Sequence, residues 1–427
     1  MKKQTQIMLM AAAVLVVIAA LIVLLTPLRS SLAWRIESTR ARVFYWLNPP
    51  EEVVFKPRQA AAETVATPVP TQPAIPTSTV AVSPDVVTLT PPPTATPIPT
   101  QAALSGIRYT DQHGLWNYCA PATLTMGLSF WGWNGTREDA GQWLKPFEKD
   151  KNVMLYEMEA FATEQAGLSA VLRSGGTPEL IKALIAGGFP VILEKGTYIR
   201  ETTTGKVSWM GHYSVLTGYD DLTAEWITQD SYYSADYRIK YDELLKEWRA
   251  FNYAFLVIYS PDRQSALDAI LGPYSDANYS YQQALEMAAA DLNTQQSVDL
   301  FFSWFNRGTS LMQLQDYTGA AGAYDQAFQL YPDLEKDLRP WRIMWYQTGP
   351  YFAYFYTGRY QDLVDLATTT IEAASEPFIE ESFYWRARAY EALGNRDGAI
   401  ADLRTSLEYH PNFGPSTTFM QQLGISN

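Results

Sequence analysis

The chain contains a single cysteine, and its surroundings suit a nucleophile. Cys119 stands in the run Tyr-Cys-Ala-Pro-Ala. Pro121 fits the first turn of a helix, because backbone N–H groups there make no hydrogen bond within the helix and proline lacks one. The sequence therefore predicts Cys119 at a helix N-terminus, where the helix dipole favours the thiolate, the form that acts as a nucleophile. For this residue taken alone, a buried and inert cysteine is the alternative.

A histidine and an aspartate follow at positions that a β-hairpin would bring together. His212 opens the run His-Tyr-Ser-Val-Leu-Thr-Gly-Tyr, and Asp230 closes the run Glu-Trp-Ile-Thr-Gln-Asp, with a turn expected over residues 220–223. A turn centred on Asp221 puts His212 directly opposite Asp230, on the same face of the ladder. A carboxylate so placed holds an imidazole in the tautomer and orientation that a general base needs. A surface ion pair is the alternative.

Helical and strand patterns surround these residues and predict the elements that position them. Helical patterns cover residues 119–131, 154–165 and 178–186, and strand patterns cover residues 190–193, 212–219, 225–229 and 253–259. Because the helices come first and the antiparallel strands after them, we expect an α+β domain over residues 106–262.

Together these residues resemble the double-glycine (bacteriocin-leader) type of papain-like cysteine peptidases, family C thirty-nine, and the broader group similar to it. The resemblance rests on Cys-Ala-Pro-Ala at 119–122, Gly-His at 211–212 with Thr-Gly-Tyr at 217–219, Asp230, and Ala-Gly-Gly-Phe-Pro-Val-Ile-Leu at 186–193. It implies a papain-like fold in which Cys119 is the nucleophile, His212 the general base and then acid, and Asp230 its orienting partner. By the same resemblance, Gln112 donates its side-chain amide to the oxyanion, together with the backbone N–H of Cys119.

The sequence departs from the family pattern in two respects. Ala120 replaces the usual glycine after the cysteine, and Gln112 lies seven residues before Cys119. His113 is a competing base by its proximity to Cys119, although a residue near a loop tip more often points to solvent. Four tryptophans could line a substrate groove, although aromatic residues at such spacings more often belong to the core. They are Trp116, Trp131, Trp133 and Trp143.

The C-terminal third carries two copies of one spacing of small and aromatic residues, at 304–332 and 383–411. Small residues let two antiparallel helices approach closely, and a proline ends each pair, so the copies resemble the tetratricopeptide repeat. A degenerate copy at 360–367, the second helix of an earlier copy at 281–291 and an insertion near 333–350 complete an all-α repeat domain over residues 263–427. An ordinary helical bundle is the alternative. Such repeats normally bind a peptide or protein partner.

The N-terminal part has two unusual compositions. Residues 7–25 are an unbroken apolar run, long enough for a bilayer core of about 30 Å and too long for the core of a signal peptide. We therefore expect a cytoplasmic tip and transmembrane signal anchor at 1–28, followed by a juxtamembrane segment at 29–56. Residues 57–105 are expected to form a Pro/Thr-rich disordered linker. Because stalks of this kind commonly hold domains away from a membrane, we expect a single-pass protein whose globular domains are extracytoplasmic, at the cell surface.

Composition excludes several other classes of function. The chain has 427 residues and a formal charge of −13, which argues against nucleic acid as a partner. A single cysteine excludes a disulfide within the chain, and with three histidines it also excludes a Cys/His zinc cluster. We expect no cofactor and no metal at the catalytic site. A Gly-rich phosphate loop is missing, so we expect no nucleotide, and bacteriocin leaders are disfavoured as substrates.

The sequence thus predicts a membrane-anchored extracytoplasmic cysteine peptidase-like thiol hydrolase with an α+β papain-like domain and an all-α tetratricopeptide-repeat domain. It would cleave peptide (amide) bonds through an acyl-thioester, with the repeats recruiting the substrate or a protein partner. The same chemistry on another acyl donor, such as a cell-wall amide or a glutamine side chain, is one alternative. A catalytically inactive papain-like and repeat-containing scaffold that binds proteins is the other. The complete set of Cys119, His212, Asp230 and Gln112 favours the enzyme, whereas Ala120 favours the scaffold.

Overall fold

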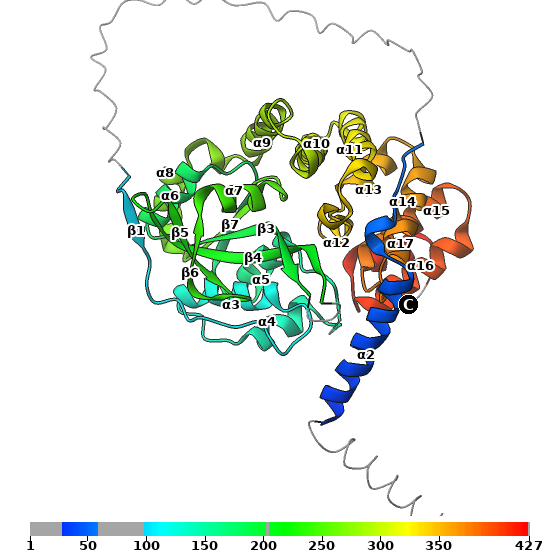
Figure 1. Ribbon diagram of the computed structural model, residues 1–427, viewed down its shortest axis with the longest axis horizontal. Helices are drawn as coiled ribbons and strands as arrows, with labels where there is room; N and C mark the ends of the chain where they lie inside the picture. Colours follow the sequence, from blue (N-terminus) through cyan, green and yellow to red (C-terminus); the bar gives the residue numbers. More distant parts are fainter. Residues whose placement is uncertain (1–27, 59–97, 148, 202–204, 426–427) are drawn as a thin grey trace, which may run out of the picture.

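The computed structural model describes residues 28–58, 98–147, 149–201 and 205–425, which form an α/β domain and a helical repeat domain (Figure 1). The predicted transmembrane anchor at residues 7–25 and most of the predicted linker lie outside the described residues. Within the described ranges, no helix combines the length and the apolar character that crossing a membrane requires.

A seven-stranded antiparallel sheet forms the centre of the α/β domain. Its main path runs β2-β7-β3-β4-β5-β6, and β1 pairs with the end of β4. The strands are β1 (Gln101–Ala103), β2 (Ser169–Arg173), β3 (Val191–Arg200), β4 (Val207–Asp220), β5 (Glu225–Asp230), β6 (Ser234–Lys240) and β7 (Phe255–Tyr259). The long central strands β3 and β4 are almost wholly buried because helices cover both faces of the sheet.

The helices of this domain fall into two layers, one on each face of the sheet (Figure 1). One layer holds α3 (Cys119–Phe130), α4 (Arg137–Leu144) and α5 (Leu155–Glu164), and the other holds α6 (Pro178–Ala186), α7 (Tyr241–Arg249) and α8 (Gln264–Leu271). Leu124 and Leu128 of α3 pack against Ile192 and Val215 of the sheet. Helix α3 is apolar along nearly its whole length, which fixes it firmly under the central strands.

The predicted helices and strands of the α/β domain are confirmed, but its boundaries differ from the expected 106–262. The domain begins earlier because β1 pairs with β4 through Gln101 and Asp220, inside the segment predicted to be linker. It also ends later, because Leu267 and Leu271 of α8 belong to the core of the same domain.

The second domain is entirely helical within the described residues, as predicted. Helices α10 and α11 form one antiparallel pair, α15 and α16 form another, and α13 and α14 lie between them. The helices are α9 (Ala277–Asp291), α10 (Ser297–Gln313), α11 (Tyr317–Leu330), α12 (Ile343–Tyr346), α13 (Gly349–Tyr356), α14 (Tyr360–Glu372), α15 (Glu380–Ala392), α16 (Arg396–Tyr409) and α17 (Gly414–Gln422). The predicted insertion is the irregular segment between α11 and α13, which contains the short helix α12.

The two domains share a hydrophobic core. Trp209 of β4 stacks on Phe251 and also packs against Phe302 of α10 and Tyr346 of α12. The Arg249 guanidinium forms ion pairs with acidic residues of the repeat domain at 3.0 and 3.3 Å. Because large aromatic side chains cross the boundary, the domains are held in one fixed arrangement.

The segment that precedes the linker also packs onto the repeats. Helix α2 (Leu28–Leu47) places Tyr45 against Trp341, and the extended stretch that follows buries Phe55 against Phe328 and Tyr354. The repeats therefore bind part of their own chain in addition to any external partner.

Candidate active site

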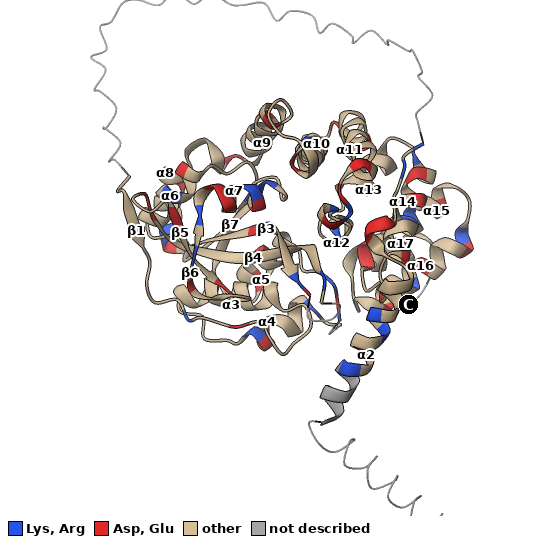
Figure 2. Ribbon diagram, viewed as in Figure 1, with Lys and Arg blue, Asp and Glu red and all other residues tan. Residues whose placement is uncertain are grey.

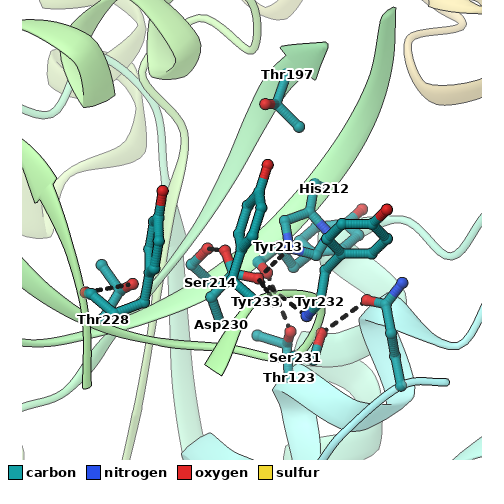
Figure 3. Close-up of polar contacts among 12 residues, drawn as sticks. Thr123, Thr197, His212, Tyr213, Ser214, Thr228, Asp230, Ser231, Tyr232 and Tyr233 are labelled. Carbon is teal, nitrogen blue, oxygen red and sulfur yellow. Dashed lines mark hydrogen bonds and ion pairs between the residues drawn. The ribbon is translucent and has the colours of Figure 1, made fainter. Parts of the chain in front are cut away.

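The β4–β5 hairpin brings His212 and Asp230 together. The strands are joined by a turn after Asp220, as predicted, and His212 Nε2 lies 2.8 Å from Asp230 Oδ1 (Figure 3). Their register differs from the expected one, because Asp220 pairs with Glu225, so the turn is centred between Leu222 and Thr223 and not on Asp221. A β-bulge between Leu216 and Gly218 then shifts the pairing by one residue. Val215 pairs with Gln229, so the same register puts Ser214 opposite Asp230 and His212 diagonal to it, still on the same face.

Asp230 is fully buried and accepts hydrogen bonds from several sides (Figure 3). Ser214 Oγ donates to Oδ2 at 2.8 Å, and the backbone N–H groups of Tyr232 and Tyr233 donate to Oδ1 at 3.0 and 3.2 Å. The buried ammonium of Lys195 lies 3.5 Å from Oδ2. Burial alone would raise the pKa of Asp230, but His212, Lys195 and the hydrogen bonds outweigh it and hold this pKa below its usual value. The carboxylate is therefore charged and fixed in position.

His212 is buried and faces both Asp230 and Cys119. Burial opposes its protonation, but the charge and hydrogen bond of Asp230, with a hydrogen bond to Cys119, raise the pKa of His212 to about 9. Because Nε2 contacts Asp230, Nδ1 is the ring nitrogen left for the Cys119 side chain. An imidazolium at this place stabilises a neighbouring thiolate.

Cys119 is the first residue of α3, as predicted, and its side chain is half-buried. Asn117, with φ at 51°, turns the chain from the preceding loop into the helix. The Asn117 side chain donates to the backbone oxygen of Asp150 at 2.7 Å, and the Lys145 ammonium donates to the backbone oxygen of Trp116 at 2.5 Å. These contacts hold the loop that presents the thiol at the positive end of the helix.

Gln112 lies beside the same cavity as Cys119 and His212. Its backbone N–H donates to the backbone oxygen of Ser231 at 3.0 Å, and its side-chain Oε1 accepts from Ser231 Oγ at 2.8 Å. Since Oε1 takes the acceptor role, Nε2 is the end of the amide that can donate to an oxyanion. The longer spacing between Gln112 and Cys119 is thus compatible with a donor at this site.

The competing base and the tryptophans have different surroundings. His113 also lines the cavity, but it is half exposed and contacts Asp111 through Nδ1 at 2.8 Å. Of the four tryptophans, only Trp116 lines the cavity, while the others pack against aromatic residues of the core. Ala120 is buried in the first turn of α3, and it also lines the cavity.

The cavity beside Cys119 has a volume of about 840 Å³ and is lined by both domains and by α2. Repeat-domain residues Arg342, Trp345 and Tyr346 form part of its wall. A methyl group on Gly211 would lie 2.9 Å from the Tyr346 ring, so the glycine before His212 lets α12 approach the site closely. The predicted insertion in the repeats therefore belongs to the candidate site.

Sequence reasoning missed the residues that support the site: Lys145, Lys195, Ser214, Ser231 and Tyr346. Ser214 could have been predicted from the sequence, since it lies two residues after His212 on the same face of one strand. Lys195 carries a weaker signal, a lysine within the strand pattern that follows Val191, and it binds Glu247 at 2.9 Å. The other three depend on contacts between distant parts of the chain.

Comparison with known proteins finds matches to two kinds of family model. Residues 101–256 match the Peptidase_C39 like family, and residues 301–334 and 381–412 each match a tetratricopeptide repeat. No curated protein matches the chain. Among solved structures, the chain is similar to "an putative C39-like peptidase from Bacillus anthracis", with 16% identity and a TM-score of 0.31, over 38% of this chain and 98% of that one. The chain thus joins a C39-like peptidase domain to two tetratricopeptide repeats.

Proposed function

We propose that the chain is a cysteine peptidase that hydrolyses peptide (amide) bonds through an acyl-thioester on Cys119. The observation that carries this proposal is the buried pair of His212 and Asp230, 2.8 Å apart, next to Cys119 at the N-terminus of α3. A charged, fixed carboxylate, an imidazole and a thiol in this order are the arrangement that activates a sulfur nucleophile. A buried cysteine without function has no need of such partners.

The chemistry follows from the positions of these groups. The Cys119 thiolate attacks the substrate carbonyl carbon, and the resulting oxyanion accepts hydrogen bonds from Gln112 Nε2 and the backbone N–H of Cys119. His212 gives its proton to the leaving nitrogen as the C–N bond breaks, which leaves a thioester on Cys119. Water, deprotonated by His212, then attacks the thioester, and the acid product leaves as the thiolate and imidazolium are restored.

The shape and charge of the cavity indicate how a substrate would bind. Because α12 and α2 form part of its wall, the substrate would lie between the peptidase domain and the repeats. Two acidic residues of the wall, Glu37 and Glu376, contact Lys149, and Glu201 contacts Arg342. The wall also carries the basic residues Arg35, Lys151 and Arg200. We expect a preference for substrate segments with acidic groups near the cleaved bond.

The protein is also proposed to be anchored in a membrane with its globular domains outside the cytoplasm. The apolar run at residues 7–25 and the Pro/Thr-rich segment that follows the juxtamembrane part support this topology. Helix α2 carries basic residues on its described part (Figure 2), among them Arg35, Arg40 and Arg42. Because Lys2 and Lys3 precede the apolar run, basic residues lie on both sides of it, and the proposed orientation rests on the Pro/Thr-rich segment. Protease added to intact cells is expected to remove the globular domains, whereas full protection would contradict the topology.

A peptide library tests the enzymatic part of the proposal. The full chain in detergent is incubated with the library, and new termini are identified by mass spectrometry. Cleavage is expected from the wild type and from His113→Ala, and it is expected to vanish in Cys119→Ala. Cys119-dependent cleavage of glutamine side chains or cell-wall amides alone, tested in parallel, would redirect the substrate class. Absence of any Cys119-dependent product from all three substrate types would favour a protein-binding scaffold instead.

A further inference from the structure

A second polar cluster lies where the two domains meet, and its three residues do not line the Cys119 cavity. Asp150 from the segment after α4 meets Glu380, the first residue of α15, and His410, which follows α16. One potential ligand atom from each of these residues lies within 4.8 Å of the others. His410 Nδ1 is 2.8 Å from Glu380 Oε1. The backbone N–H of Lys151 donates to the backbone oxygen of Phe378 at 3.1 Å, so the two segments are also joined through the main chain.

The negative charge of this cluster is poorly compensated. Asp150 and Glu380 are 3% and 2% exposed, and Glu380 Oε2 is buried without a hydrogen-bond partner among the described residues. The carboxylate of Glu381 lies close enough to repel that of Glu380. Glu157 lies close enough to add to the repulsion on Glu380.

The nearby basic groups are directed elsewhere. The Lys145 ammonium donates to the backbone oxygens of Trp116 and Asn117, at 2.5 and 3.3 Å. Lys151 lies over the rings of Trp345 and Phe378. Buried carboxylates are costly unless they are paired with a cation or coordinate a metal ion. The cluster therefore has the character of a cation site.

We propose that Asp150, Glu380 and His410 bind a divalent transition-metal ion of the Zn²⁺ or Mn²⁺ type, which fastens the repeats to the peptidase domain. Two carboxylate oxygens and one imidazole nitrogen suit these ions, whereas Ca²⁺ prefers oxygen ligands alone. Binding replaces the contact between His410 Nδ1 and Glu380 Oε1. Glu380 Oε2, buried and unpartnered among the described residues, offers the ion a further oxygen.

The ion would also act on the loop that presents Cys119. The backbone oxygen of Asp150 accepts from Asn117 Nδ2 at 2.7 Å, and Asn117 stands two residues before the thiol. A metal ion that fixes Asp150 against the repeats therefore steadies the turn into α3. The repeats would in this way control the order of the loop that carries Cys119 without touching the thiol.

Isothermal titration with ZnCl₂, MnCl₂ and CaCl₂ tests the proposal. The full chain is used with the Cys119→Ala substitution, which removes the thiol as a competing ligand. We expect one Zn²⁺ or Mn²⁺ per chain, with the affinity at least ten-fold weaker in Asp150→Asn and in His410→Asn and unchanged in His113→Asn. Absence of saturable binding, binding indifferent to Asp150→Asn and His410→Asn, or equal affinity for Ca²⁺ would overturn the assignment.

A second measurement avoids the risk that these variants fail to fold. The chain has three histidines, so modification by diethyl pyrocarbonate can be followed at each of them by mass spectrometry. Zn²⁺ is expected to slow the modification of His410 at least ten-fold and to leave that of exposed His113 unchanged. Equal modification of His410 with and without the ion would overturn the site.

Discussion

His212 Nε2 lies 2.8 Å from Asp230 Oδ1, and the two side chains are 2% and 0% exposed. The pair is built across a hairpin whose strands are joined by one short turn and distorted by one bulge. Ser214, Lys195 and two backbone N–H groups hold the carboxylate, so the imidazole has a fixed partner on one side and Cys119 on the other. This rigidity is what a general base requires.

Replacement of Asp230 by asparagine removes the charge that favours the protonated form of His212. We expect the substitution to lower the pKa of His212 and to slow hydrolysis of a cleavable peptide by about 10²- to 10⁴-fold. The pH profile of the reaction should shift, which a simple loss of structure would not produce. Ser214→Ala, which removes one hydrogen bond to the same carboxylate, is the control and should cost less than about ten-fold. Equal losses in both variants would contradict the role given to the charge.

Gln112→Ala tests the oxyanion donor separately from the nucleophile. Turnover should fall by about 10²- to 10³-fold, because the oxyanion loses one donor, while alkylation of Cys119 should keep its rate. Ser231→Ala frees the Gln112 amide to rotate and should give a smaller loss of the same kind. Peptide hydrolysis and alkylation are measured side by side. Unchanged turnover in Gln112→Ala would remove this residue from the site.

The pH dependence of stability reports on His212. The pKa of His212 rises from 6.5 to about 9 on folding, so its stabilising contribution is fully present below pH 6.5 and is lost as the pH rises through 9. The difference corresponds to about 3 kcal/mol. The free energy of unfolding by urea should therefore fall between pH 6.5 and 9 in the wild type. The fall should be absent from His212→Gln and retained in His113→Gln. If stability depended on pH in the same way in all three proteins, the contribution assigned to His212 would be contradicted.

Phe55 anchors the N-terminal segment on the repeats. Its ring lies 5.1 Å from that of Phe328, and Arg58 beyond it contacts Asp365 at 2.9 Å. Phe55→Ala removes about 3 to 5 kcal/mol of packing and should release this segment, so trypsin should cut after Arg58 at least about ten-fold faster. Trp46→Ala is the matched control, because Trp46 is 78% exposed and should leave the rate unchanged. Equal rates in both variants would show that the segment is held by other contacts.

Local patterns in the sequence predict much of the peptidase domain. Pro121 marks the start of α3, and Gly187 with Gly188 separates α6 from β3, as the structure has them. These features depend on neighbouring residues, so a single sequence carries them. Strand β6 was missed because most of its residues are exposed and give no alternation of apolar and polar positions. Strand β1 has only three residues, and its pairing with β4 stabilises it.

The details of the candidate site depend on contacts that no local pattern contains. The turn is centred between Leu222 and Thr223, and the bulge between Leu216 and Gly218 shifts the pairing by one residue, so Asp230 lies diagonal to His212 on the same face. Tyr346 lies in the insertion of the repeats, yet it packs over Gly211 and lines the cavity. The contact between Asp150 and Glu380 likewise joins residues of two domains. Such long-range packing is decided by the whole fold.

Alkylation of Cys119 by iodoacetamide, followed over a range of pH, tests the central claim most directly. Cys119 is the only thiol in the chain, so Cys119→Ala provides a complete blank. An activated thiolate–imidazolium pair predicts rapid alkylation far below the ordinary thiol pKa of about 8.5, at least about ten-fold slower in His212→Ala and unchanged in His113→Ala. A thiol that reacts slowly until the pH approaches about 8.5, and that is indifferent to His212→Ala, would contradict the account.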